Sequence, residues 1–401
     1  MKTLRVVVLG MAAALGIGLM ACNRKPAEPA ATPAAPVPVA PVPAAPIKIG
    51  AIFSVTGPAS NLGAPEARTA EMFVAELNAK GGLLGRQVEL VLKDSGGSPE
   101  KAVSFAKQLI DEDKVLAIVG PSTSGESMQI KAICEQNRMI LVSCAAAEDI
   151  VNPVAQYVFK TPQKDSQAAA WIFGTMKKMG IAKIGVVSGN DGYGKAGRKQ
   201  LEQLAPSMGI EIAAAEEYDK DATDLTDILA KLKAAGVSAV VNWSIVPAQS
   251  IVAKNMKQMG FDVPLFQSHG FGNIKYVELA GEAANGILFP ASKLLIAERL
   301  PDDHPGKAML VAYKQGYEAK FNEPVSTFGG HAYDALLVIK TAVEKAGNTD
   351  RDQVRTAIEE IKGLVGTAGV FNFSPGDHNG LGMDAFEMMT VKDGQFAPLE
   401  D

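Results

Sequence analysis

The stretch from Val115 to Cys144, VLAIVGPSTSGESMQIKAICEQNRMILVSC, decides the fold class. It contains two short apolar runs, VLAIVG and MILVSC, separated by a segment with the features of a helix. Thr123 followed by Glu126 has the spacing of a capping box, which marks the start of that helix. A strand, a helix and a second strand in this order predict a parallel βαβ unit.

The same unit recurs along residues 47–291, where apolar runs alternate with amphipathic helical stretches. Extended crossings near residues 160–162 and 289–291 divide this run into two parts. Helices predicted at 306–320, 331–346 and 351–362 would return to the first part. The 355 residues from 47 to 401 exceed the size at which one core usually stops growing. We therefore predict an α/β protein with two doubly wound parallel-sheet lobes.

The N-terminal segment predicts export. Residues 1–21 have the features of a signal peptide, with Lys2 and Arg5 preceding an apolar run that is too short to span a bilayer comfortably. The run ends in LMAC, which resembles the bacterial lipobox and predicts a lipid on Cys22, although a plain signal peptide remains an alternative. Residues 23–46 hold eight prolines and eight alanines, a composition that favours an extended tether. Asn23, directly after the predicted lipidated cysteine, favours the outer membrane as the final location of the protein.

The composition argues against several functional classes. The net charge of -5 has both signs interspersed along the chain, so nucleic acid is not an expected partner. The motifs of zinc peptidases, serine hydrolases and phosphate-binding loops are missing, so we expect no enzymatic activity. Four scattered histidines show no metal-ligand spacing, and we expect neither a metal nor another cofactor. Cys134 and Cys144 are expected to be free thiols.

Three motifs, GPSTSGESM (120–128), NDGYG (190–194) and FGGHAYDAL (328–336), follow one another in this order. With the alternating pattern, they resemble the solute-binding proteins of ABC importers of the branched-chain amino-acid type. These are type I periplasmic binding proteins, in which two lobes joined by a multi-strand hinge close on a small molecule. The resemblance implies lobe 1 at residues 47–161 and 291–372, and lobe 2 at 162–290 and 373–401. It also implies a permease as the protein partner.

The resemblance assigns site residues to this chain. Ser124 falls on the family's carboxylate-binding serine, and the first free amides of its helix would also attract an anion. A helix cap with no further role is the alternative. Residues Ala145 and Ala147 would supply backbone groups to the ligand, although Ala147 stands where amino-acid binders commonly have a threonine hydroxyl.

Aromatic residues complete the predicted site. Tyr193 belongs to GYGKAG, which literally matches a dinucleotide fingerprint, but the family uses this loop to place an aromatic ring at the cleft. Trp243 closes the strand AVVNWS and should reach the cleft unless it is simply core. Phe328 falls where the family packs an aromatic ring on the ligand.

His269 stands where binders of α-amino acids generally have an acidic residue. A buried ammonium group needs a carboxylate partner, because leaving it unpaired costs several kcal/mol. An imidazole instead suits a hydroxyl, a carbonyl or a second carboxylate. We therefore expect a carboxylate ligand without an α-amino group, with aromatic acids first, aliphatic oxo- or hydroxy-acids second and branched-chain amino acids third. A sensory receptor domain would use the same cleft. The remaining histidines, His304, His331 and His378, are expected to be structural.

Overall fold

The computed structural model describes residues 45–400. The predicted signal peptide (1–21), the predicted lipidation site at Cys22 and the tether up to residue 44 lie outside the described residues. Within the described part, no helix combines the length and the apolar character needed to cross a membrane.

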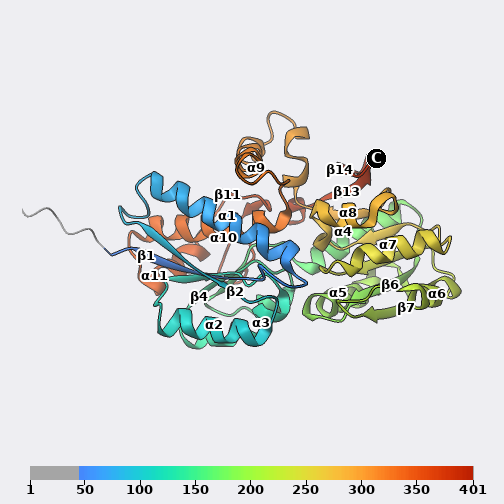
Figure 1. The fold of residues 1–401 in the computed structure, drawn as a ribbon, viewed down its shortest axis with the longest axis horizontal. Coiled ribbons are helices and arrows are strands. Elements are labelled where there is room, and N and C mark those ends of the chain that lie inside the picture. Colours follow the sequence, from blue (N-terminus) through green and yellow to red (C-terminus); the bar gives the residue numbers. More distant parts are fainter. Residues whose placement is uncertain (1–44, 401) are drawn as a thin grey trace, which may run out of the picture. The chain divides into compact units, whose positions relative to one another are not determined.

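The first lobe is built on a sheet of five parallel strands in the order β2-β1-β3-β4-β5. The strands are β1 (Ile47–Phe53), β2 (Val88–Asp94), β3 (Ala117–Val119), β4 (Ile140–Ser143) and β5 (Val158–Lys160). Two pairs of helices cover its two faces (Figure 1): α1 (Ser60–Ala79) with α10 (Thr327–Ala346), and α2 (Pro99–Asp111) with α3 (Ser124–Gln136). The βαβ unit predicted from residues 115–144 is β3-α3-β4, and the predicted capping box is present at Thr123 and Glu126.

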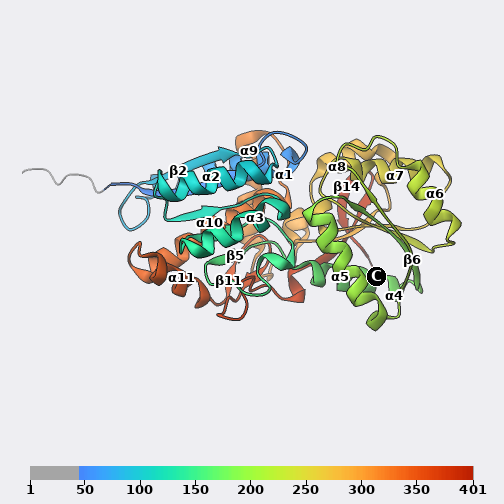
Figure 2. The ribbon, with the colours of Figure 1, turned by 90° about the horizontal axis from the view of Figure 1, so that it is seen from below.

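The second lobe has a seven-stranded sheet in the order β14-β13-β10-β9-β8-β6-β7. Five strands are parallel: β6 (Lys183–Gly189), β7 (Glu211–Tyr218), β8 (Ala239–Trp243), β9 (Leu265–Gln267) and β10 (Leu288–Ala291). The antiparallel hairpin β13 (Glu387–Lys392) and β14 (Gln395–Pro398) extends the sheet beyond β10. Figure 2 shows α4 (Asp165–Lys178) and α5 (Gly192–Met208) on one face, and α6 (Thr226–Ala234), α7 (Ala248–Gln258) and α8 (Ile274–Ala280) on the other. The predicted two-lobed α/β fold is confirmed.

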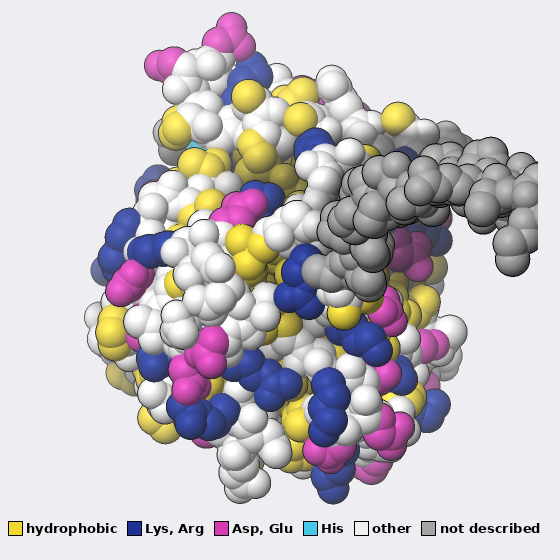
Figure 3. Space-filling view, turned by 90° about the vertical axis from the view of Figure 1, so that its left-hand side faces the viewer, with side chains coloured by type: hydrophobic (Ala, Val, Ile, Leu, Met, Phe, Trp, Pro, Cys, Tyr) yellow, Lys and Arg dark blue, Asp and Glu magenta, His cyan; other side chains and the backbone are white. Residues whose placement is uncertain are grey.

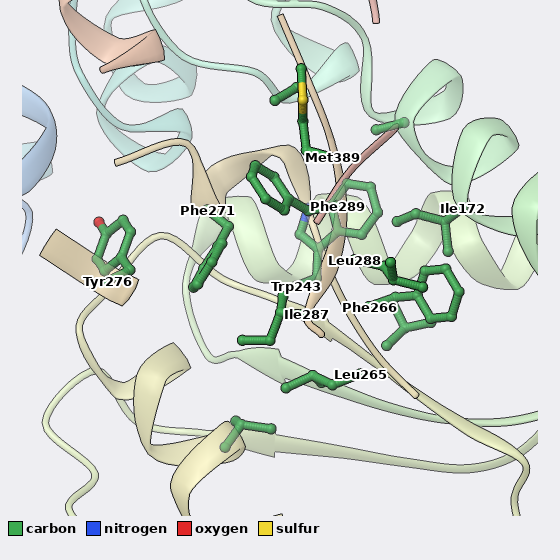
Figure 4. Packing of buried hydrophobic residues seen from close by; sticks show 14 of the residues in the cluster. Ile172, Trp243, Leu265, Phe266, Phe271, Tyr276, Ile287, Leu288, Phe289 and Met389 are labelled. Carbon is green, nitrogen blue, oxygen red and sulfur yellow. The ribbon is translucent and has the colours of Figure 1, made fainter. Parts of the chain in front are cut away.

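A dense aromatic core holds the second lobe together (Figure 4). Trp243 at the end of β8, Phe271 after β9 and Phe289 in β10 are all fully buried, and the rings of Phe271 and Phe289 meet edge to face at 5.3 Å. Complete burial of such large rings contributes roughly 1.5–3 kcal/mol each. This packing makes the second lobe a rigid support for the loops at the carboxyl ends of its strands.

The two cysteines of the described chain are free thiols, as predicted. Cys134 lies within α3 and Cys144 directly follows β4, and both are buried. Burial raises the pKa of both thiols, so neither exists as a reactive thiolate near neutral pH.

Three segments cross between the lobes: residues 160–165, the segment after Ala291, and the segment between Ala385 and Glu387. The third differs from the predicted boundary at residue 373. Residues 373–385 remain with the first lobe because the Phe373 ring meets Phe159 of β5 edge to face at 5.9 Å, and His378 stacks on Phe159 at 4.1 Å. The chain packs against the core of the second lobe again only from Phe386 onward.

The described chain enters the first lobe at a fixed point. The Arg86 guanidinium donates hydrogen bonds to the carbonyl oxygens of Ala45, at 2.8 Å, and Pro46, at 3.4 Å, just before β1.

On the end of the molecule seen in Figure 3, cationic and acidic side chains are interspersed with apolar ones.

The remaining elements lie beside the first lobe and the hinge. They are α9 (Lys307–Phe321), α11 (Arg351–Glu359) and the short hairpin of β11 (Leu364–Val365) and β12 (Val370–Phe371). Tyr313 of α9 shares a 2.8 Å hydrogen bond with Thr69 of α1, and α11 packs on α10.

Candidate functional site

Two helix N-termini from different lobes meet at the carboxyl ends of the sheets. The first lobe contributes α3, in which the Thr123 hydroxyl accepts a hydrogen bond from the Glu126 amide, and the Glu126 carboxylate accepts one from the Thr123 amide. The second lobe contributes α5, whose first amides at Tyr193 and Gly194 donate to the Asp191 carboxylate. The amides of a first helical turn have no partner within the helix, and they favour negative charge nearby.

A cavity of about 20 Å³ lies between the lobes beside these two N-termini. Five of the seven predicted site residues line it: Ser124, Ala145, Tyr193, His269 and Phe328. The sequence also predicted Ala147 and Trp243 here, and neither lines the cavity. Ala147 is buried behind it, with its amide donating to the Ser124 hydroxyl at 3.2 Å.

Trp243 supports the site from behind instead of reaching the cleft. Its side chain is 0% exposed and contacts Gly197 of α5 so closely that a β-carbon on this glycine would lie 2.0 Å from the indole nitrogen. The glycine at position 197 of GYGKAG therefore makes room for the indole. Packing against Trp243 therefore accounts for the last glycine of the pattern that resembles a dinucleotide fingerprint.

His269 opens a short 3-10 turn, η2 (His269–Phe271), directly after β9 and Ser268. Its side chain is 5% exposed and lines the cavity, and its Nδ1 atom lies 3.3 Å from the Tyr193 hydroxyl. Burial, followed by the positive charge of Lys160, lowers the pKa of His269 well below its usual value. The imidazole is therefore neutral near pH 7, with one N–H donor and one acceptor nitrogen.

The lobes are in contact around the cavity. A β-carbon on Gly192 of α5 would lie 2.8 Å from the Cα atom of Gly125 of α3. The Asn273 side-chain amide donates to the Asn61 carbonyl at 2.8 Å, a carbonyl left free within α1 because Pro65, four residues later, has no N–H group. Lys199 of α5 pairs with Asp149 of the first lobe at 3.0 Å. This is a closed arrangement of the lobes.

Comparison with known proteins identifies this architecture. Residues 46–395 match the family model described as periplasmic binding protein. The chain belongs to the periplasmic binding protein family. Proteins of this family that serve ABC importers bind small molecules outside the cytoplasm and deliver them to permeases, and this chain is a solute-binding protein of that type.

Individual relatives of this periplasmic binding protein are distant but cover most of it. The leucine-, isoleucine-, valine-, threonine- and alanine-binding protein of Pseudomonas aeruginosa is 28% identical over 316 residues, covering 78% of this chain and 81% of the relative. The structure of the branched-chain amino acid transporter substrate binding protein LivJ from Streptococcus pneumoniae, in complex with isoleucine, is 28% identical. Its TM-score is 0.77, and the match covers 88% of this chain and 97% of that one.

A second solved structure shares the fold at lower identity. It is a solute-binding protein of an ABC transporter from Rhodopseudomonas palustris BisB5 in complex with 3,4-dihydroxybenzoic acid. It is 18% identical, with a TM-score of 0.76, and the match covers 88% of this chain and 96% of that one.

This periplasmic binding protein also has polar residues at the site that the sequence did not reveal. Ser122 and His331 line the cavity, although His331 was expected to be only structural. Burial lowers the pKa of His331 to about 3, so it too is neutral. Beneath the wall, the Ser122 hydroxyl donates to Glu66, and burial raises the pKa of this fully buried carboxyl well above its usual value.

Two buried ionisable residues, Lys160 and Asp165, lie at the first crossing between the lobes. The Lys160 ammonium donates to the carbonyl oxygens of Ala146 and Gln163, and burial lowers its pKa to about 8. Burial likewise raises the pKa of Asp165, the first residue of α4, to about 7. The Asp165 Oδ1 atom lies 3.6 Å from His269 Nε2. Neither Lys160 nor Asp165 lines the cavity.

A larger cavity of about 400 Å³ lies at the mouth of the cleft and shares Tyr193 and Ile245 with the inner one. The carboxylates of Asp191, Asp219 and Asp221 line its second-lobe side. Among residues 45–400, no three His, Cys, Asp or Glu side chains are grouped closely enough to hold a metal ion.

Proposed function

We propose that this periplasmic binding protein captures a small carboxylate without an α-amino group, an aromatic acid such as benzoate or a hydroxybenzoate. The observation that carries the proposal is the lining of the inner cavity. The N-terminus of α3 with Ser124 faces two neutral imidazoles and the rings of Tyr193 and Phe328, and no carboxylate is among the described lining residues.

The charges of the site argue against an ammonium group. The cavity offers hydroxyls and imidazole nitrogens, while the nearest carboxylates, Glu66 and Asp165, are buried behind Ser122 and His269. An ammonium group enclosed without an ionised partner would cost several kcal/mol. A ligand carboxylate, by contrast, gains from the helix N-terminus and the Ser124 hydroxyl.

Ligand capture requires the lobes to separate. A cavity of about 20 Å³ holds about one water molecule, so an aromatic acid fits only after hinge opening and partial reclosure around it. The wider cavity at the mouth is the route into the site. The permease would then recognise the ligand-bound closed form.

The second candidate is a conventional amino-acid binder. It is favoured by the Pseudomonas relative, whose name specifies five aliphatic or hydroxylated amino acids, and by LivJ, whose complex holds isoleucine. The Rhodopseudomonas protein with dihydroxybenzoic acid supports the aromatic-acid proposal only at the level of the fold.

The remaining proposals concern the class of protein and its anchoring. The chain is proposed to be a binder and not an enzyme, because the inner cavity pairs no nucleophile with an ionised base. A lipid on Cys22 would hold it on the periplasmic side of the membrane, with the outer membrane slightly favoured by Asn23.

A thermal-shift screen tests the ligand class. The purified protein, unfolded and refolded to remove bound solute, is mixed with benzoate, hydroxybenzoates, phenylacetate, short oxo-acids, leucine and valine. A ligand at a hundred times its dissociation constant stabilises the protein by about 2.7 kcal/mol. Stabilisation by aromatic acids and not by leucine or valine supports the proposal. Stabilisation by leucine or valine alone overturns it in favour of the amino-acid binder.

A further inference from the structure

The ring of His269 is enclosed on three sides by other aromatic rings. Tyr193, Trp243 and Phe386 each meet it close to edge-on, with ring centroids 5.6, 5.7 and 5.6 Å away. These contacts fix the plane of the imidazole. Its two nitrogens therefore point in fixed directions, Nδ1 toward the Tyr193 hydroxyl and Nε2 toward Asp165.

The facing polar atoms of Asp165 and His269 have no hydrogen-bond partner among the described residues. Both oxygens of Asp165 and the Nε2 atom of His269 are buried, and none makes a hydrogen bond of normal geometry within the described residues. Lys160, the nearby cation, donates to backbone carbonyls at Ala146 and Gln163. Because a buried polar atom without a partner is destabilising, a shift of a few tenths of an ångström that joins Oδ1 to Nε2 is favoured.

We infer that Asp165 is a positioning residue that determines the hydrogen-bonding character of the ligand site by fixing the proton of His269 on Nε2. A carboxylate accepts the Nε2–H bond, which leaves Nδ1 as the acceptor for the Tyr193 hydroxyl. Asp165 does not touch the ligand itself. It acts through His269 and Tyr193, both of which line the cavity.

The position of this proton decides what the second-lobe wall offers a ligand. With the proton on Nε2, the Tyr193 hydroxyl donates to Nδ1, and the tyrosine oxygen keeps lone pairs that can accept a hydrogen bond from a ligand hydroxyl. With the proton on Nδ1, the tyrosine accepts it and its own hydroxyl is free to donate, which suits a second carboxylate or a carbonyl. This step rests on the proposed function. With the proton held on Nε2, the site should bind hydroxy-substituted aromatic acids more tightly than unsubstituted or dicarboxylic ones.

The direct test is the ¹⁵N spectrum of the histidine side chains in the ligand-free full chain at pH 8. Only four histidines are present, and the His269 signals are assigned by their loss in His269→Gln. The two tautomers give different ¹⁵N shifts for Nδ1 and Nε2. We expect the Nε2–H form in the wild type and a shift toward Nδ1–H in Asp165→Ala. Asp165→Asn, which keeps an acceptor oxygen, should retain part of the Nε2–H form.

Asp334→Asn is the matched control. Asp334, within α10, is also a fully buried carboxyl, and its oxygens accept hydrogen bonds from the backbone amides of Thr367 and Ala368. It should lower stability without changing the His269 tautomer. An Nδ1–H form in the wild type, or an unchanged tautomer in Asp165→Ala, would overturn the inference.

Affinity measurements give the second readout. The preference for 4-hydroxybenzoate over benzoate should fall roughly tenfold in Asp165→Ala, the equivalent of one hydrogen bond. An unchanged preference overturns the specificity role. If neither acid binds the wild type, the proposed function fails, but the tautomer of the ligand-free protein still decides whether Asp165 positions His269.

Discussion

Gly192 of the second lobe packs so closely against Gly125 of the first that a β-carbon on Gly192 would lie 2.8 Å from the Cα atom of Gly125. The contact joins backbone to backbone, so no flexible side chain can move aside. Closure of the lobes therefore depends on a hydrogen atom at this position.

Gly192→Ala should hold the lobes apart and weaken ligand binding roughly tenfold or more, because overpacking costs about 1–3 kcal/mol. The dissociation constant is measured by calorimetry for the compound that stabilises the wild type, and closure by small-angle scattering. Gly174→Ala is the matched control, since nothing lies within 4 Å of its added carbon. Equal affinity in Gly192→Ala and the wild type would show that this contact does not limit closure.

Ser124→Ala should reduce the affinity for a carboxylate ligand about tenfold, because the ligand loses a hydroxyl partner at the α3 N-terminus. Ser127→Ala on the same helix is the control. Its hydroxyl bonds to Ser143 at 2.8 Å and does not line the cavity, so this variant should lose stability and keep its affinity. A loss of affinity in both variants alike would assign the effect to the helix as a whole.

Trp243→Phe should destabilise the protein by about 1–3 kcal/mol while changing ligand affinity no more than roughly threefold. The indole is fully buried behind the cavity wall, so its loss leaves a void in the core of the second lobe. Urea unfolding and calorimetry separate the two effects. A large loss of affinity without a loss of stability would show that Trp243 contacts the ligand, as the sequence predicted.

His269→Glu should replace aromatic-acid binding by leucine binding, because it supplies a carboxylate for an ammonium group. The substitution is made together with Asp165→Asn, since two carboxylates this close would repel each other. His269→Gln with Asp165→Asn is the neutral control and should bind neither class tightly. Unchanged affinity for the native ligand in His269→Ala would remove His269 from the site.

The stability of the protein should depend on pH through Asp165. Burial raises its pKa to about 7, against about 3.9 in an unfolded chain. The folded state therefore holds the proton more tightly, and this contribution to stability is full below about pH 4 and is lost as the pH rises through 7. Asp165→Asn should make the measured decline smaller, as followed by urea unfolding from pH 4 to 8, while buried Asp334, whose pKa is also raised to about 7, still contributes. Parallel curves for the two proteins would contradict it.

Much of the fold followed from local sequence patterns. The strand, helix and strand predicted from residues 115–144 are β3, α3 and β4, and the capping box at Thr123 marks the true start of α3. The helix predicted from residue 331 begins earlier, at Thr327, where the Ser326 side chain caps it by accepting a hydrogen bond from the Gly329 amide. Bonds that join distant segments could not be read from the sequence, so the return of residues 373–385 to the first lobe was missed.

The site divides in the same way. Residues at the carboxyl ends of strands and at helix N-termini, such as Ser124, Tyr193 and His269, could be placed from the sequence because the parallel fold brings these ends together. Asp165 could not, because its importance comes from burial against His269, a hundred residues away in the chain. Trp243 was placed at the cleft because a strand end does not reveal which way an indole turns.

The hydrogen bonds from Arg86 to Ala45 and Pro46 tie the N-terminal end of the described chain to the first lobe. A pull applied to the N-terminal end of the described chain enters β1 and its sheet directly, without passing through the hinge. Movement of the second lobe about the hinge therefore leaves this end of the described chain in place. In mechanical terms, a force on this end of the chain is carried by the first lobe, and the second lobe bears none of it.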